Sequence, residues 1–185
     1  MVAEFVCGIR EKNPDYLSAC KDLPEYQDTG YCVLHFPGEE KTEDFEQVKK
    51  DKLEQQDYDF GGAIFPDGTS NFERYEFDAD VNFTGATFVG KANFQEAQFS
   101  SRYTFFRRAQ FSGEMTSFDR AQFSGEGTSF VGAQFGSAET SFQEATFAKE
   151  VYFSGVTFSE KVTFWGTQGN RVFGPGAWAQ FDRPG

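Results

Sequence analysis

Phenylalanine recurs between Tyr58 and Phe164 with a fixed spacing that leaves very few folds open to the chain. Nine pairs have the form Phe-x4-Phe, and the step from one pair to the next is six or seven residues. The pairs are Phe60/Phe65, Phe72/Phe77, Phe83/Phe88, Phe94/Phe99, Phe106/Phe111, Phe118/Phe123, Phe130/Phe135, Phe142/Phe147 and Phe153/Phe158, and Phe164 begins a tenth. Self-similarity at so short a step predicts a solenoid, because helical hairpins and propeller blades need longer units.

A second column of residues lies two positions before each phenylalanine and is mostly small or β-branched. Ala63, Ala86, Thr104 and Val151 are typical members. Residues two apart point to the same face of an extended segment, so each unit directs one ring and one smaller side chain inward. The residues that follow each phenylalanine are mainly polar or glycine, as in turns.

A unit of five residues provides one short strand and one corner. Four such sides close a square coil, and successive coils stack at the strand spacing of about 4.8 Å. Every fourth ring then belongs to one column, with steps of 22 to 24 residues. We expect the residues in excess of twenty per coil at alternate corners, where Gly113, Gly125 and Gly136 begin short bulges. The pattern therefore predicts an all-β solenoid of about five coils with a ring-filled interior.

The repeated stretches resemble a known family. Phe83-Thr-Gly-Ala-Thr-Phe88 and Phe94-Gln-Glu-Ala-Gln-Phe99 are typical of the pentapeptide-repeat family, in its phenylalanine-rich variant with expanded corners. The resemblance covers residues 58–164 and implies a right-handed quadrilateral β-helix. The chain departs from the common family pattern in its longer alternate corners.

Residues 1–40 form a different region, with all three cysteines and the only histidine of the chain. Cys7, Cys20, Cys32 and His35 have the spacing Cys-x12-Cys-x11-Cys-x2-His. Three thiolates and an imidazole match the four tetrahedral ligands of a structural Zn²⁺ site. So short a segment has little core of its own and needs such a cross-link. We predict a zinc-binding head, with three buried free thiols and an incidental histidine as the alternative.

Residues 41–57 have the pattern of a short helix that caps the first coil. Thr42 is the expected N-cap, and Phe45, Val48 and Leu53 form a narrow apolar stripe. We expect the side chains of Lys49, Lys50 and Lys52 to be solvated. Solenoids need caps because each end exposes an open strand edge, although a partner-binding helix is the alternative.

Two further segments carry aromatic residues outside the ring columns. Phe105 is expected to point outward beside Arg102, Arg107 and Arg108, either as a contact patch or as a single exposed ring. Residues 165–185 have aromatics without periodicity, at Trp165, Phe173, Trp178 and Phe181. This C-terminal segment is expected to be a cap over the last coil, or a homodimer contact, since the family resemblance implies association through a terminal coil.

The charge of the chain disfavours direct binding to nucleic acid. The net charge is −12, of which residues 1–60 contribute −8 and residues 61–185 contribute −4. No run of eighteen apolar residues predicts a transmembrane helix, so no membrane partner is expected. The N-terminus lacks the pattern of a secretory leader, and three cysteines argue against a disulfide framework. We therefore expect a cytoplasmic protein.

The sequence contains no recognisable catalytic constellation. The only histidine, His35, lies in the head, and phosphate-binding loops and zinc-protease helices are absent from the sequence. We expect a non-catalytic scaffold whose rod binds a protein partner of unknown identity. The alternative, implied by the family resemblance, is a DNA mimic that binds DNA gyrase or topoisomerase. A rod with a charge of −4 is weakly suited to imitate phosphates.

Overall fold

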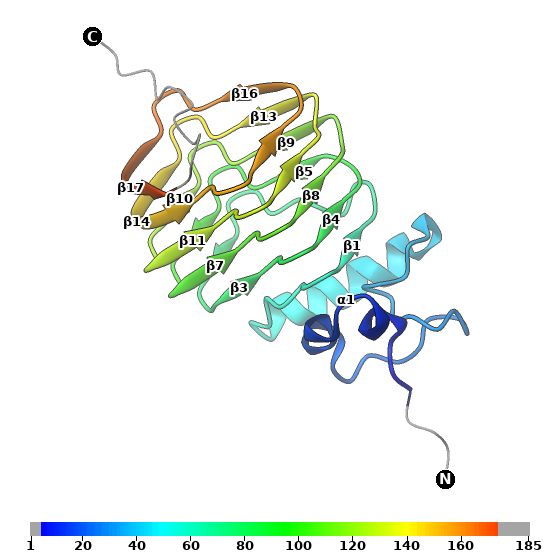
Figure 1. Cartoon of the computed structure of the whole chain (residues 1–185). Coiled ribbons are helices and arrows are strands. Elements are labelled where there is room, and N and C mark those ends of the chain that lie inside the picture. Colours follow the sequence, from blue (N-terminus) through cyan, green and yellow to red (C-terminus); the bar gives the residue numbers. More distant parts are fainter. Residues whose placement is uncertain (1–4, 174–185) are drawn as a thin grey trace.

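The computed structural model describes residues 5–173, with side chains to residue 169. Short parallel strands stack into a coil of four sides, with the N-terminal head and helix α1 (Thr42–Glu54) at one end and the last strand at the other (Figure 1). The largest single-sided sheet has five strands, one for each level of the coil. The predicted all-β solenoid of about five coils, with a small head and a short capping helix, is confirmed.

The elements are short because each side of the coil holds only a few residues between corners. Three 3-10 helices in the head, Gly8–Glu11, Pro14–Cys20 and Glu39–Lys41, precede α1. The strands are β1 (Ile64–Phe65), β2 (Glu76–Phe77), β3 (Val81–Asn82), β4 (Thr87–Phe88), β5 (Ala92–Asn93), β6 (Gln98–Phe99), β7 (Tyr103–Phe105), β8 (Gln110–Phe111), β9 (Met115–Ser117), β10 (Gln122–Phe123), β11 (Gly127–Ser129), β12 (Gln134–Phe135), β13 (Glu139–Ser141), β14 (Thr146–Tyr152), β15 (Thr157–Phe158), β16 (Lys161–Thr163) and β17 (Gln168–Phe173).

The strands form three parallel sheets. Their orders are β1-β4-β8-β12-β15, β16-β13-β9-β5, and β2-β6-β10-β14-β11-β7-β3 with β17 beside β14. The last sheet spans two sides of the coil because β14 continues around a corner. Phe147 of β14 pairs with Phe123 on one side, and Val151 pairs with Thr128 on the next.

The predicted columns of rings are present as four stacked ladders. Each ring stacks on the ring one coil away, with centroids 4.6–5.5 Å apart and planes within 18°. Rings of different ladders meet edge to face, as between Phe106 and Phe118 at 5.3 Å. Aromatic pairs favour both geometries, so every ring in the interior has favourable neighbours within and between ladders.

The corners alternate between tight turns and bulges, as predicted. Arg74, Glu96 and Arg120 take left-handed backbone angles at one tight corner, with φ between 56° and 58°. The bulges include Gly113, where a Cβ atom would overlap the backbone of Gly90 in the coil below. Glycine is therefore required at this bulge by the close approach of two coils.

The first coil has an edge that later coils do not share. In the later coils, the amide after each ring of the β4 column donates to the coil below, as Val89 does to the carbonyl of Phe65 at 3.1 Å. The equivalent residue of the first coil is Pro66, which has no amide hydrogen to satisfy. Proline thus leaves no unpaired amide at this position of the first strand edge, where Pro66 itself is buried.

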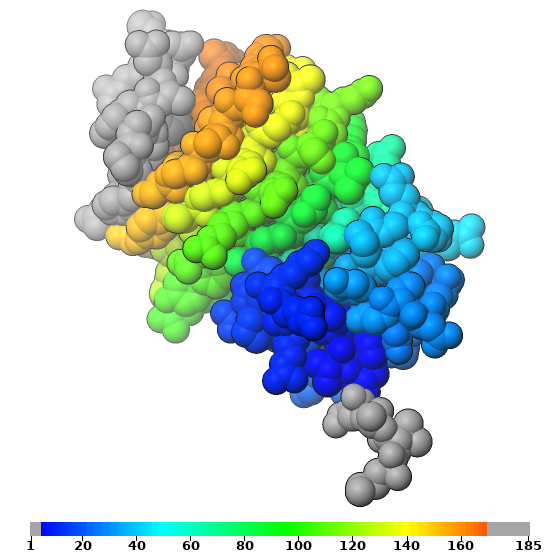
Figure 2. All heavy atoms as spheres, turned by 45° about the vertical axis from the view of Figure 1, so that its right-hand side comes forward, coloured from blue at the N-terminus to red at the C-terminus, as the bar shows by residue number. Residues whose placement is uncertain are grey.

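The N-terminal head and helix α1 lie against the first coils (Figure 2), and two lysines of the helix are buried on that surface. The expectation that Lys49 and Lys52 are solvated is wrong, since only 7% and 8% of each residue is exposed. Their ammonium groups lie 5.5 Å from the rings of Phe72 and Phe60 and donate to backbone carbonyls. Long aliphatic stems suit the apolar end of the coil, while the ammonium groups find π faces and carbonyl oxygens.

The start of α1 also differs from the prediction by one position. Thr42 is the first helical residue rather than the N-cap, and Lys41 takes the capping position without a side-chain hydrogen bond. The Thr42 hydroxyl donates to the carbonyl of Glu39 at 2.7 Å. The 3-10 turn that precedes the helix shifts its start, as is common at helix ends.

The regular coil continues beyond Phe164, where the ring pattern stops. Strand β17 pairs with β14 and so adds a further strand to the largest sheet. Trp165 lies next to Gly166 at a tight corner and is 54% exposed. The remaining aromatics of the predicted cap or homodimer contact, Trp178 and Phe181, lie outside the described residues.

Candidate metal centre and rod surface

The head brings together the four residues that the sequence singled out. Cys7 directly precedes the first 3-10 helix, and Cys20 is the last residue of the second. The amide of Gly8 donates to the carbonyl of Gly30 at 2.7 Å, which holds Cys7 beside the loop that leads to Cys32. Many zinc sites take two ligands from a close Cys-x2-4-Cys pair. Here two short helices bring together two cysteines that lie further apart in the sequence.

The second pair of residues lies on one tight turn. The amides of His35 and Phe36 both donate to the carbonyl of Cys32, at 3.1 and 2.9 Å. This turn places the Cys32 sulfur 3.2 Å from Nδ1 of His35. The spacing of two residues between these groups therefore serves to put both side chains on one side of the turn.

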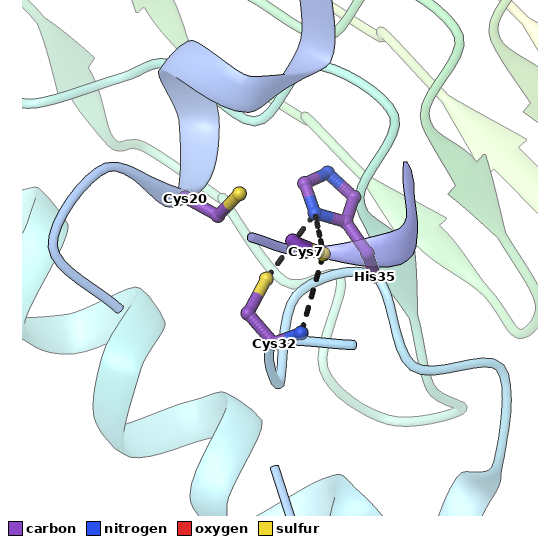
Figure 3. Close-up of side chains that lie close together, drawn as sticks. All are labelled: Cys7, Cys20, Cys32 and His35. Carbon is purple, nitrogen blue, oxygen red and sulfur yellow. Dashed lines mark hydrogen bonds between the residues drawn. The ribbon is translucent and has the colours of Figure 1, made fainter. Parts of the chain in front are cut away.

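The side chains of Cys7, Cys20, Cys32 and His35 converge on one point (Figure 3). Their sulfur and nitrogen atoms all lie within 4.8 Å of one another, and all four residues are buried. Nδ1 of His35 is 3.6 Å from the Cys7 sulfur, which also accepts from the Cys32 amide at 3.3 Å. Tetrahedral bonds of about 2.0–2.3 Å to one metal ion would place the donor atoms about 3.5–3.8 Å apart. The four side chains fit such an ion.

Contacts within the cluster shift the pKa values of Cys7, Cys20 and His35 in different directions. Hydrogen bonds from the side chains of Cys20 and Cys32 hold the pKa of Cys7 well below its ordinary value. The contacts with Cys32 and Cys7 raise the pKa of Cys20. Burial lowers the pKa of His35, but its contacts with the sulfurs of Cys32 and Cys7 outweigh burial and raise it to about 9. Without a cation, one ionised sulfur makes ionisation of its neighbours less favourable. A dication would stabilise all three thiolates at once.

The imidazole of His35 also connects the head to the rod. Its Nε2 lies 2.9 Å from the carbonyl of Gly61 in the first coil. With the proton on Nε2, the ring donates to this carbonyl and presents a free Nδ1 lone pair to the sulfurs. A histidine that binds a metal through one nitrogen commonly donates its other N–H in this way, which fixes the ring orientation.

Two neighbours of the cluster were not predicted from the sequence. The carbonyl of Leu34, between Cys32 and His35, accepts from the Ile64 amide at 2.8 Å and from Lys41 Nζ at 3.1 Å. Lys41 is completely buried, although it follows two glutamates in a run that reads as exposed. Neither contact could be predicted from the sequence, because both use the backbone carbonyl of Leu34, a group that every residue has.

Four glutamates on the surface of the rod, Glu96, Glu126, Glu139 and Glu144, are paired with bases of a neighbouring coil. Arg74 and Arg120 each bind a glutamate of the adjacent coil at 2.8 Å, Glu96 and Glu144 respectively. Elsewhere on the rod, Arg102 binds Glu126 at 2.8 Å, and Lys161 of β16 binds Glu139 of β13 at 2.7 Å. These pairs break up the acidic surface along the rod.

Phe105 points outward, as predicted, on the face formed by β7, β11 and β14. Its ring stacks on Tyr103 at 5.9 Å, and the Arg107 guanidinium lies 4.9 Å from it. Beside these rings is a cleft of about 380 Å³ that Ser129 and Tyr152 also line. Phe105 therefore belongs to an aromatic patch rather than standing alone.

Comparisons with protein-family models, curated proteins and solved structures give no match for this chain. The resemblance to pentapeptide-repeat proteins accordingly rests on the residue pattern itself. Among residues 5–173, no helix has the length and apolar character needed to cross a membrane.

Proposed function

We propose that Cys7, Cys20, Cys32 and His35 hold one structural Zn²⁺ ion. The observation that carries this proposal is the convergence of three buried thiols and one imidazole within 4.8 Å. Sulfur and imidazole ligands in a tetrahedral set favour Zn²⁺ over the oxygen-seeking Mg²⁺ and Ca²⁺. Four protein ligands leave no open position for substrate, so the ion stabilises the head rather than performing chemistry.

The ion would hold the head against the first coil. Its ligand His35 reaches the carbonyl of Gly61, and the turn between Cys32 and His35 presents Leu34 to the Ile64 amide of β1. Metal binding is thereby coupled to the folding of the head and to its packing on the N-terminal end of the rod. A thiolate centre of this kind needs reduced cysteines, which supports a cytoplasmic location.

The protein as a whole is a non-catalytic scaffold that binds a protein partner. Stacked rings fill the inside of the coil, so the outer faces of the rod and head are the surfaces on which a partner can bind. The patch of Tyr103, Phe105 and Arg107 is the best contact candidate, because aromatic residues and arginine are enriched in protein interfaces.

Site-specific photo-crosslinking tests the scaffold proposal. A benzoyl-phenylalanine is placed at position 105, and a matched one at the exposed Gln110 of β8, a strand of a different sheet. The proposal predicts a discrete protein adduct in cells from position 105 and none from position 110. Equal labelling at both positions would remove the patch as the contact surface.

A DNA mimic that binds gyrase is the second candidate, and the paired corners argue against it. A mimic needs a continuous acidic face, whereas Glu96 and Glu144 are each bound to arginine. A supercoiling assay with excess protein separates the two functions. Inhibition of gyrase would favour the DNA mimic, whereas full gyrase activity would exclude the mimic and support the scaffold function.

A further inference from the structure

Lys41 is a completely buried basic residue, and no carboxylate among residues 5–169 forms an ion pair with it. The residue is 0% exposed, and its ammonium group lies 4.9 Å from the centroid of the Phe45 ring. The other two lysines buried at this end of the rod each have an acidic partner, Glu46 for Lys49 and Asp57 for Lys52. A buried charge without a partner of opposite sign is costly, so Lys41 needs an explanation.

The ammonium group of Lys41 lies next to the proposed metal centre. It donates to the carbonyl of Leu34, which stands between the ligands Cys32 and His35. Burial lowers the pKa of Lys41 to about 7, and the negative charge of the Cys32 thiolate opposes that shift. Cys32 of the cluster is thus a source of negative charge that acts on this lysine.

The proposed centre would have an excess of negative charge. Three thiolates and a neutral imidazole outweigh the two positive charges of Zn²⁺ by one unit. We propose that Lys41 is the counter-ion of this centre, and that its ammonium group strengthens metal binding without contacting the metal. The inference rests on the proposed zinc site and adds a positioning residue to it.

The expected loss of zinc affinity can be estimated from groups in other proteins that contact metal ligands but not the metal itself. Their removal commonly weakens metal affinity about 10–100-fold. Charge interactions are strong in a buried site, where water does not screen them. We therefore expect Lys41→Gln, which removes the charge but keeps a donor near the Leu34 carbonyl, to weaken zinc binding by about 10–100-fold.

Zinc affinity measured by competition with a chromophoric chelator tests the inference. Lys41→Gln is compared with the wild type, with Lys41→Arg and with Lys49→Gln. Lys49 is the matched control, because it is also buried and bonded to a carbonyl, that of Thr69, but has Glu46 as its partner. We expect Lys41→Arg to restore affinity and Lys49→Gln to leave it unchanged. Equal losses in Lys41→Gln and Lys49→Gln would overturn the inference.

A double-mutant cycle separates charge from packing. Cys20→His converts the centre to two thiolates and two imidazoles, which together with Zn²⁺ are neutral. In that background, Lys41→Gln should no longer weaken zinc binding, because there is no excess charge to compensate. The same loss in both backgrounds would assign Lys41 a packing role instead. A wild type that binds no zinc would refute the site itself, whereas tight binding by both wild type and Lys41→Gln would refute only the counter-ion.

Discussion

Tyr16 of the head occupies the space that a side chain at Gly85 would fill. A Cβ atom at position 85 would overlap the tyrosine ring, and the same is true at Gly62 one coil below. Both glycines lie at a tight corner with φ of +67° and +69°. The head is therefore packed on the first two coils by this ring as well as by the bond from His35 to Gly61.

Replacing Gly85 with alanine should displace the tyrosine ring. The variant combines the strain of a left-handed alanine with an overlap on Tyr16. Gly155→Ala is the matched control, since its φ is +69° and its nearest neighbours are 3.8 Å away. Chemical denaturation should show Gly85→Ala to be less stable than the control by about 1–3 kcal/mol. Equal stability would mean that the ring of Tyr16 contributes nothing to docking.

Truncation of an inward ring should be far more damaging than truncation of an outward one. Phe123 stacks on Phe99 and Phe147 inside the coil, and its removal leaves a cavity. We expect Phe123→Ala to lower the free energy of unfolding by about 3–5 kcal/mol. Phe105→Ala should cost less than about 1 kcal/mol, because the side chain lies on the surface. Similar losses in the two variants would contradict this assignment.

The corner pair of Glu96 and Arg74 should stabilise the rod only when the carboxylate is charged. The hydrogen bond from Arg74 holds the pKa of Glu96 below its ordinary value of 4.5. The folded protein thus keeps Glu96 ionised to a lower pH than the unfolded chain does. Its contribution is complete above the pKa of the unfolded chain and disappears as the pH falls through the lowered pKa of the folded protein.

Melting temperatures at two pH values test this pair. Glu96→Gln should be slightly less stable than the wild type at pH 7 and indistinguishable from it near pH 3. The control is Glu76→Gln, which changes an exposed glutamate of β2 and should have no such pH dependence. A difference between Glu96→Gln and the wild type that stays constant with pH would show that the effect is not electrostatic.

The spacing of phenylalanine was sufficient to predict the rod. A five-residue step between rings fixes which side chains point inward. Each coil has two to four residues more than four such steps need, and these extra residues can be placed only at the corners. Even the choice of Phe106 over Phe105 as the inward ring follows from keeping that step. Repetition makes each such inference strong, because one wrong register would misplace a whole ladder.

The cluster of three cysteines and one histidine was predicted from residue types, but its surroundings were not. Cysteine and histidine have few common roles, so Cys7, Cys20, Cys32 and His35 could be grouped without knowing the fold. Lysine has many roles, and the burial of Lys41, Lys49 and Lys52 could not be predicted, because their acidic neighbours suggest a solvated surface. Their burial depends on carbonyls and rings that only the folded end of the coil brings near.

Removing the metal should loosen the head and leave the rod folded. The rod has its own ladders of rings, whereas the head depends on the cluster for much of its cross-linking. After treatment with a strong chelator, limited proteolysis should cut within residues 1–40 and spare residues 58–164. Readdition of Zn²⁺ should restore protection of the head. Cleavage that is equally fast with and without the metal would show that the head does not need it.

The most direct test of the account is the zinc content of the purified, untagged protein. Elemental analysis against protein concentration should give one zinc ion per chain, and Cys32→Ser should lose most of it. Thiol reagents should react with the three cysteines only after the metal is removed. A wild type without zinc, with all three thiols freely reactive, would contradict the account and leave the head as a metal-free cap.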